Sequence, residues 1–184
     1  MQKEKFNKRI YKIFLGDQKD HSGARINNYY KKGNWKDLAE KGKKRQKEIL
    51  QILKNKKVVF MGQDYFMAGM IFQHGMTIED SKKTIVLAKK GADLGNDQAK
   101  WLYAAATDRL LIRQGKKQKF GTQYTKKNNK WRLCPVDRKI TDKERVKYNV
   151  VPLKEALSKA EVWNKEKINP WEQKRKTTGI SSKK

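Results

Sequence analysis

The stretch Gln98-Ala-Lys-Trp-Leu-Tyr-Ala-Ala-Ala-Thr-Asp-Arg-Leu-Leu-Ile-Arg113 runs directly into Gln114-Gly-Lys-Lys-Gln-Lys-Phe-Gly-Thr-Gln-Tyr124, and the two halves differ in pattern. The first half is rich in alanine and leucine, and Asn96 or Asp97 supplies an N-cap, so it predicts a helix. The second half has a Gly/Lys turn and then a short alternating run, which is typical of a strand. The stretch therefore predicts a helical domain that carries a β-hairpin.

Further helices are predicted on the N-terminal side of this stretch. Apolar residues at helical spacing indicate helices at residues 4–15 and 35–54, and residues 63–74 are apolar nearly all round, as in a buried helix. Gly16 is expected to end the first helix, which leaves residues 17–23 as a polar loop. Thr77 and Asp80 fit a capping box for a helix that ends near Leu94, with Gly95 as its C-cap.

On the C-terminal side, an Asn-rich turn at residues 126–130 joins the two strands of a hairpin near residues 118–136. Thr141 and Glu144 fit a second capping box, and Pro152 starts a last helix that runs to about Trp163. The expected fold is mainly α (α+β), with five or six helices and one hairpin. We expect one domain over residues 1–164, with a basic N-terminal helix, and a basic, flexible tail over residues 165–184.

The charge of the chain is distributed unevenly. The formal net charge is +27, yet residues 58–112 contain equal numbers of acidic and basic side chains. The excess favours contact with a polyanion, of which nucleic acid is the commonest; the alternative is a solvated basic coat without a dedicated ligand. No apolar run approaches the roughly 18 residues of a membrane span, and the single Cys134 cannot form an internal disulfide. We therefore expect a cytoplasmic protein without membrane contact.

Three polar residues lie beside apolar segments. His74 ends the apolar run 63–74, where a helix C-terminus favours the imidazolium and suits a general acid or base. The alternative is a histidine that caps the last carbonyls of the helix. Asp108 and Arg109 point about 100° apart on their helix, so each needs its own partner. They are either a structural ion-pairing set or a catalytic carboxylate with an anion-binding guanidinium.

Residues 121–123, Gly-Thr-Gln, allow a ligand to approach the backbone and supply hydroxyl and amide contacts. The Gly-Lys-Ser/Thr order of a P-loop is absent from this segment. No His/Cys cluster has the spacing of a metal site, and no histidine lies near Cys134 in the sequence. We therefore expect no metal, no cofactor and no catalytic thiol.

Together these residues resemble the signature of a widespread bacterial domain family of unknown function. The matching elements are Gln73-His74, Asp108-Arg109, Gly115-Lys-x-Gln118-x-Phe-Gly121-Thr122-Gln123-Tyr124, Asp17-Gln18-Lys-Asp20-His21, Asp142-Lys-Glu-Arg145 and Pro152-Leu153. They span roughly residues 15–160. The chain departs from the family at His21, where arginine is usual, and at Phe120, where tyrosine is usual. The resemblance implies that the polar groups converge in space, but it supplies no reaction.

The first functional hypothesis is a metal-independent hydrolase or transferase that acts on a phosphate-containing or other anionic substrate. His74 is the expected general acid or base, and Asp108 is expected to orient it or to activate water. Arg109 and Gln123 are expected to hold the anion. The complete set of expected substrate-binding residues is Asp17, Gln18, Asp20, Gln73, Arg109, Gln118, Thr122 and Gln123.

The alternative hypothesis is a non-catalytic protein that associates with RNA, the ribosome or other nucleic acid. Residues 41–57 carry a single acidic residue among their lysines, and residues 113–132 carry none. Basic groups hold phosphates, and interleaved aromatic rings can stack on bases. The expected contact residues are Lys43, Lys44, Arg45, Lys47, Lys126, Lys127, Lys130 and Arg132.

Overall fold

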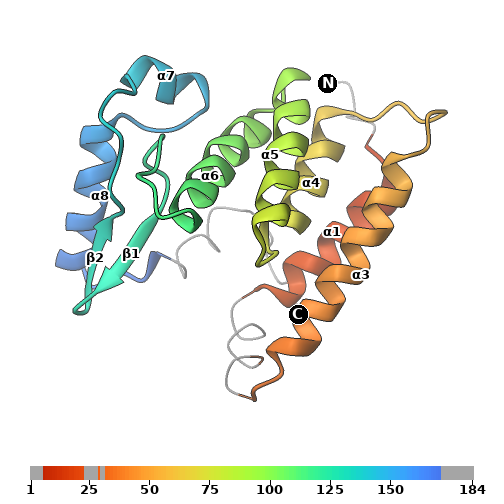
Figure 1. The fold of residues 1–184 in the computed structure, drawn as a ribbon, viewed down its shortest axis with the longest axis horizontal. Coiled ribbons are helices and arrows are strands. Elements are labelled where there is room, and N and C mark those ends of the chain that lie inside the picture. Colours follow the sequence, from red (N-terminus) through yellow and green to blue (C-terminus); the bar gives the residue numbers. More distant parts are fainter. Residues whose placement is uncertain (1–5, 23–28, 30–31, 171–184) are drawn as a thin grey trace.

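The computed structural model describes residues 6–22, 29 and 32–170 of the chain. Figure 1 shows a central group of helices, with the N-terminal helices on one side of it and the hairpin with the C-terminal helices on the other. The elements in chain order are α1 (Lys8–Asp20), α3 (Trp35–Leu53), α4 (Gly62–Gln73), α5 (Ile78–Asp93), α6 (Asp97–Arg113), β1 (Tyr124–Lys127), β2 (Lys130–Leu133), α7 (Asp142–Lys147) and α8 (Leu153–Lys165).

The central helices α4, α5 and α6 pack closely because small residues lie where they meet. A Cβ atom added to Gly91 of α5 would lie 2.7 Å from the Cβ of Ala99 and 3.0 Å from the carbonyl oxygen of Gly62. A Cβ added to Gly69 of α4 would lie 3.0 Å from a methyl carbon of Leu102. These positions accept glycine without rearrangement, so the small residues allow the three backbones to approach one another.

Helices α1 and α3 pack on each other and on α4 through one apolar cluster. Its fully or nearly buried members are Ile10, Ile49, Ile52, Met67, Ala68, Ile71, Phe72 and Leu87. A buried carboxylate, Asp64, fixes the start of α4 relative to α1, because it accepts hydrogen bonds from the backbone N–H groups of Met61 and Asn7 at 2.9 and 2.7 Å. This packing brings the C-terminal ends of α1 and α4 together.

Helix α1 does not end at Gly16, as predicted, but continues to Asp20. The guanidinium of Arg45 on α3 donates to the carbonyl oxygen of Gly16 at 3.2 Å and to the Asp20 carboxylate at 2.5 Å. These contacts outweigh the penalty of one glycine inside a helix, which is about 1 kcal/mol. The predicted polar loop is therefore wrong for residues 17–20, which form the last turn of α1.

The hairpin carries the C-terminal part of the domain. Strands β1 and β2 are antiparallel, and Asn128 and Asn129 of the turn both have positive φ, as a type I′ turn requires. Helix α8 packs on β2: the side chain of Asn164 accepts from the backbone N–H of Trp131 at 2.7 Å and donates to its carbonyl at 2.9 Å. The hydroxyl of Tyr124 donates to the carbonyl of Ala156 at 2.8 Å.

The predicted class is confirmed: the described part is mainly helical with one hairpin, although it contains seven helices rather than five or six. The predicted capping residues Thr77, Asn96 and Thr141 each accept a hydrogen bond from a backbone N–H of the helix that they begin. Within the described ranges, no helix combines the length and the apolar character needed to cross a membrane. Most of the predicted basic tail, residues 171–184, lies outside the described residues, as do residues 1–5.

The close helix contact at Gly91 makes a stability prediction. Gly91→Ala should lower the free energy of unfolding by about 1–3 kcal/mol, because the added methyl group collides with Ala99 and with the backbone of α4. Gly42→Ala in α3 is the matched control, since no atom lies within 4 Å of its added Cβ. The control should gain up to about 1 kcal/mol from helix propensity. Urea unfolding measures both, and equal stability of the two variants would contradict this packing.

Candidate functional site

The carboxylate of Asp17 is the centre of a polar cluster where α1, α3 and α4 meet. Asp17 is fully buried, in the last turn of α1. Its Oδ2 atom lies 2.6 Å from Nδ1 of His74, and its Oδ1 atom lies 3.5 Å from Nδ1 of His21 and 3.6 Å from Nη1 of Arg45. A buried carboxylate is costly unless it is paired. The cluster supplies its partners from three helices.

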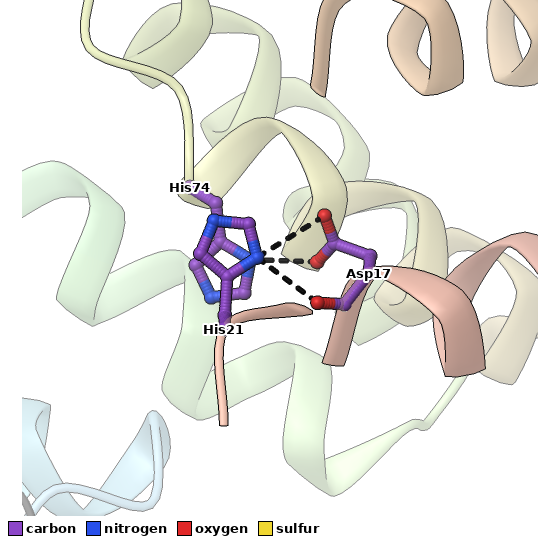
Figure 2. A group of neighbouring side chains, drawn as sticks. All are labelled: Asp17, His21 and His74. Atoms are coloured by element: carbon purple, nitrogen blue, oxygen red, sulfur yellow. Dashed lines mark hydrogen bonds and ion pairs between the residues drawn. The ribbon is translucent and has the colours of Figure 1, made fainter. Parts of the chain in front are cut away.

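The two histidine rings are stacked above the same carboxylate, as Figure 2 shows. Their centroids are 3.9 Å apart and their planes differ by 19°. His21 Nδ1 also lies 3.0 Å from the carbonyl oxygen of Asp17, one helical turn earlier. Burial, and then the charge of the neighbouring His74, lower the pKa of His21. His74 is the C-cap of α4 and its side chain is 23% exposed, so this ring connects the buried carboxylate with solvent.

Arg45 belongs to this cluster and not to an open nucleic-acid surface. Its side chain is 19% exposed and makes a close ion pair with Asp20, in addition to its hydrogen bond to the Gly16 carbonyl. The prediction that Arg45 contacts nucleic acid is therefore not supported by its surroundings. The Oδ2 atom of Asp20 accepts a hydrogen bond from Arg45, so this oxygen is already bonded to protein. Gln18, also predicted to bind substrate, donates to Asp17 Oδ2 at 3.3 Å.

Arg109 on α6 reaches the same end of α4. Its Nη1 atom donates to the carbonyl oxygen of Gln73 at 2.6 Å, next to His74. Burial, and then the charge of Arg113, lower the pKa of Arg109 to about 10, so it remains a cation at neutral pH. Among the described residues, no carboxylate pairs with Arg109. Gln73 is buried, and its side-chain oxygen has no hydrogen-bond partner in the described part of the chain.

Asp108, one residue earlier, faces a different part of the molecule. It is fully buried, and its Oδ1 accepts hydrogen bonds from the backbone N–H groups of Lys119 and Phe120, both at 2.7 Å. Its Oδ2 accepts from the backbone N–H and the hydroxyl of Thr122, at 2.9 and 2.8 Å. Both oxygens are occupied, so Asp108 anchors the loop before the hairpin. This environment does not support the predicted catalytic role, and the partner that orients His74 is Asp17.

Gln118 and Gln123 complete this second network. The amide of Gln118 is fully buried and bonds to both the N–H and the carbonyl of Gln123, and to the carbonyl of Cys134. Gln123 donates to the hydroxyl of Thr122 at 2.9 Å. Between them, Gly121 has a φ of 83°, which favours glycine. The Gly-Thr-Gln segment therefore closes a tight loop on α6, and the polar groups of Thr122 and Gln123 are bonded to protein there.

The residues that were expected to form one site therefore form two separate networks. Arg109 and Asp108, which are neighbours on α6, belong to different ones. The first contains Asp17, Asp20, His21, Arg45 and His74, with Arg109 and Gln73 beside it. The second contains Asp108, Gln118, Thr122 and Gln123. A cavity of about 100 Å³ is found elsewhere, at the start of α4, and is lined by Phe6, Met61, Gly62, Gln63, Leu94, Gly95 and Asn96. None of the predicted site residues lines it.

Sequence reasoning also missed a set of possible metal ligands. One ligand atom each from Asp17, His21 and His74 lies within 4.8 Å of the others. The sequence spacing gave no metal site, but the fold brings together three residues that could hold an ion. The signal was the spacing of Asp17 and His21, which are four residues apart and lie on one helix face once α1 continues past Gly16.

The other basic residues of the predicted nucleic-acid-binding set are exposed. Lys43, Lys44 and Lys47 are exposed on α3, and Lys126, Lys127, Lys130 and Arg132 are exposed on the hairpin. Helix α3 and the hairpin lie on opposite sides of the central helices in Figure 1. The two basic runs are therefore separate surfaces.

Comparison of the chain with protein-family models, with curated proteins and with solved structures gave no match. The resemblance to the bacterial family therefore remains a prediction from the motif residues.

The anchoring role of Asp108 can be tested by stability. Asp108→Asn should lower the free energy of unfolding by at least about 2 kcal/mol, because the amide nitrogen would face backbone donors that are buried. Asp93→Asn is the matched control: Asp93 is 60% exposed in its pair with Lys89, and its loss should cost less than about 0.5 kcal/mol. Chemical denaturation measures both. A stable Asp108→Asn variant would show that the network does not depend on this carboxylate.

Proposed function

We propose that the chain is a hydrolase or transferase that acts on a phosphate-containing or other anionic substrate, with Asp17 and His74 as its acid–base pair. The observation that carries the proposal is the 2.6 Å contact between a fully buried carboxylate and Nδ1 of a partly exposed imidazole. A carboxylate in this position holds the ring in one tautomer and stabilises its protonated form. This is the arrangement of an activated general base.

The other ring nitrogen of His74, Nε2, is the atom that takes and returns the proton. Among the described residues, Nε2 of His74 has no hydrogen-bond partner, so it is open to a water molecule or a substrate hydroxyl. As base, Nε2 takes the proton of the attacking O–H group, and that oxygen forms a bond to the phosphorus atom. The P–O bond to the leaving group breaks, and the leaving oxygen receives the proton from His74.

The anionic class of the substrate is inferred from Arg109. A partly buried guanidinium without a carboxylate partner is unfavourable in a folded protein, and a bound anion relieves that cost. Arg109 is fixed through one nitrogen to the carbonyl of Gln73, the last residue of α4 and the neighbour of His74. Its other N–H groups remain available to a phosphate oxygen. A planar guanidinium can hold two such oxygens at once, which lysine cannot.

The activity test uses p-nitrophenyl phosphate and bis(p-nitrophenyl) phosphate as probes of mono- and diester hydrolysis. His74→Ala and Asp17→Asn should each lower kcat by about 10²- to 10⁴-fold, the usual contribution of a general base. Arg109→Lys should mainly raise KM, because the charge is kept and the fork geometry is lost. The rate of p-nitrophenol release gives kcat and KM for all three variants.

Asp93→Asn is the control for Asp17→Asn, since it makes the same chemical change at an exposed site. It should retain the activity of the unmodified chain. Circular dichroism establishes that each variant is folded. A folded His74→Ala variant with unchanged kcat would contradict the proposed base.

The hairpin supports nucleic-acid association as a second candidate function. Lys127 and Lys130 are direct cross-strand partners, and Lys126 and Arg132 extend the same exposed ribbon. Like charges placed opposite each other destabilise a hairpin. A polyanion would relieve this repulsion, so the placement favours a ligand that carries many phosphates.

Salt dependence tests this second function. The logarithm of the affinity for a single-stranded RNA oligonucleotide should fall linearly with the logarithm of the salt concentration, by about 0.7 per phosphate contact. Replacing Lys126, Lys127 and Lys130 with glutamine should flatten that slope by up to about 2, while Lys82→Gln on α5 should leave it unchanged. Fluorescence anisotropy gives the slopes. Equal slopes for the two variants would remove the hairpin as the binding surface.

A further inference from the structure

We propose that Asp17, His21 and His74 bind a divalent first-row transition-metal ion, of which Zn²⁺ is the probe of choice. Two imidazoles and one carboxylate are a frequent ligand set for Zn²⁺ and for Fe²⁺, and three protein ligands leave further positions open to water or substrate. The inference deepens the proposed function, because it concerns the same residues and names the cofactor of that site.

The geometry places three ligand atoms around one point. In a tetrahedral zinc site the metal–ligand bonds are about 2.0–2.2 Å, so neighbouring ligand atoms are roughly 3.3 Å apart. His21 Nδ1 lies 3.5 Å from Asp17 Oδ1, close to that spacing. His74 Nδ1 lies 2.6 Å from Asp17 Oδ2, a hydrogen bond that has to open slightly to admit an ion. Figure 2 shows both Nδ1 atoms directed at the same carboxylate.

The buried oxygen of Asp17 is the second observation that points to a ligand. Asp17 is fully buried, and its Oδ1 atom has no hydrogen-bond partner among the described residues, although His21 and Arg45 lie at 3.5 and 3.6 Å. Buried carboxylate oxygens without hydrogen bonds are rare in folded proteins. A metal ion at the centre of the cluster would coordinate this oxygen and remove the deficit.

Ligation replaces two hydrogen bonds to Asp17, the one from His74 Nδ1 to its carboxylate and the one from His21 Nδ1 to its backbone carbonyl. Ligation through Nδ1 requires the ring proton to sit on Nε2. Within the described part of the chain, Nε2 of neither histidine is hydrogen-bonded to protein, so either ring can change tautomer. His21 and His74 are the C-caps of α1 and α4, so both helices end at this cluster, and helix C-termini attract cations.

The neighbouring arginines affect how tightly the metal ion binds and how the metal-loaded site would hold a substrate. Arg45 already neutralises part of the charge of Asp17 and Asp20, which weakens the attraction for a metal. An ion bound beside Arg109 would make the region strongly positive. It would therefore hold an anionic substrate more tightly than Arg109 does alone, and it would take over the activation of water from His74.

The test is a titration of the untagged full-length chain after treatment with a chelator and desalting. Isothermal calorimetry should show saturable binding of one Zn²⁺ per chain, and Co²⁺ should give visible absorption bands. Mg²⁺ at the same concentrations should not bind, because it prefers oxygen ligands in octahedral geometry. Absence of saturable Zn²⁺ binding would overturn the inference.

Substitutions identify the ligands. His21→Ala and His74→Ala should each weaken Zn²⁺ binding by at least about 100-fold, more than the loss of a residue that only supports a ligand. Cys134→Ser is the control, since it removes the single thiol of the chain and should bind Zn²⁺ like the unmodified protein. A folded His21→Ala variant with unchanged affinity would overturn the assignment. If the variants do not fold, Co²⁺ added to the unmodified protein should broaden the ring signals of both histidines, and sharp signals would overturn it.

Hydrolysis assays with and without the chelator separate the two proposals. Zn²⁺ binding without any phosphate ester hydrolysis would leave the metal site standing and remove the proposed function. Hydrolysis that persists in the chelator, with no saturable Zn²⁺ binding, would leave the acid–base pair standing and remove the metal site.

Discussion

The burial of the Asp17 carboxylate is the constraint on which this end of the structure depends. A carboxylate that is completely removed from water has to be matched by donors or cations, and its own helix cannot supply enough of them. Arg45 comes from α3, and His74 and His21 are the C-caps of α4 and α1. The same constraint explains why α1 continues past Gly16, because only the additional turn brings Asp20 and His21 into the cluster.

The polar residues that carry the family resemblance have two roles, one structural and one chemical. Asp108 fastens the loop at residues 118–123 to α6, partly through Thr122, and Gln118 closes the loop on Gln123. Arg145 on α7 adds a hydrogen bond to the carbonyl of Phe120 at 3.1 Å. Asp108, Gln118 and Arg145 are buried, and they and Thr122 are all hydrogen-bonded to protein. Asp17, His21, His74 and Arg109 lie together where α1 and α4 end, and the His74 ring is partly exposed, so chemistry is expected there. Arg109 follows Asp108 directly in the sequence, so this pair contributes one residue to each network.

The local patterns of the sequence predicted most of the fold. Capping residues such as Thr77 and Asn96, and the alternation around residues 126–130, report on neighbouring positions and were interpreted correctly. The end of α1 could not be predicted in the same way, because Gly16 and Asp17–Asp20 look like a helix stop until Arg45 is placed beside them. His74 was identified as the central histidine, but its carboxylate partner was taken to be Asp108. Only the tertiary packing shows that Asp17, 57 residues earlier, occupies that position.

The direct test of this account is the state of the imidazole rings in solution. The chain contains two histidines, so long-range ¹H–¹⁵N correlation spectra give a small and assignable set of ring-nitrogen signals. Metal-free protein should carry a hydrogen-bonded proton on His74 Nδ1, and Asp17→Asn should shift the ring signals of both histidines. Ring signals typical of free imidazole, unchanged in a folded Asp17→Asn variant, would contradict this prediction.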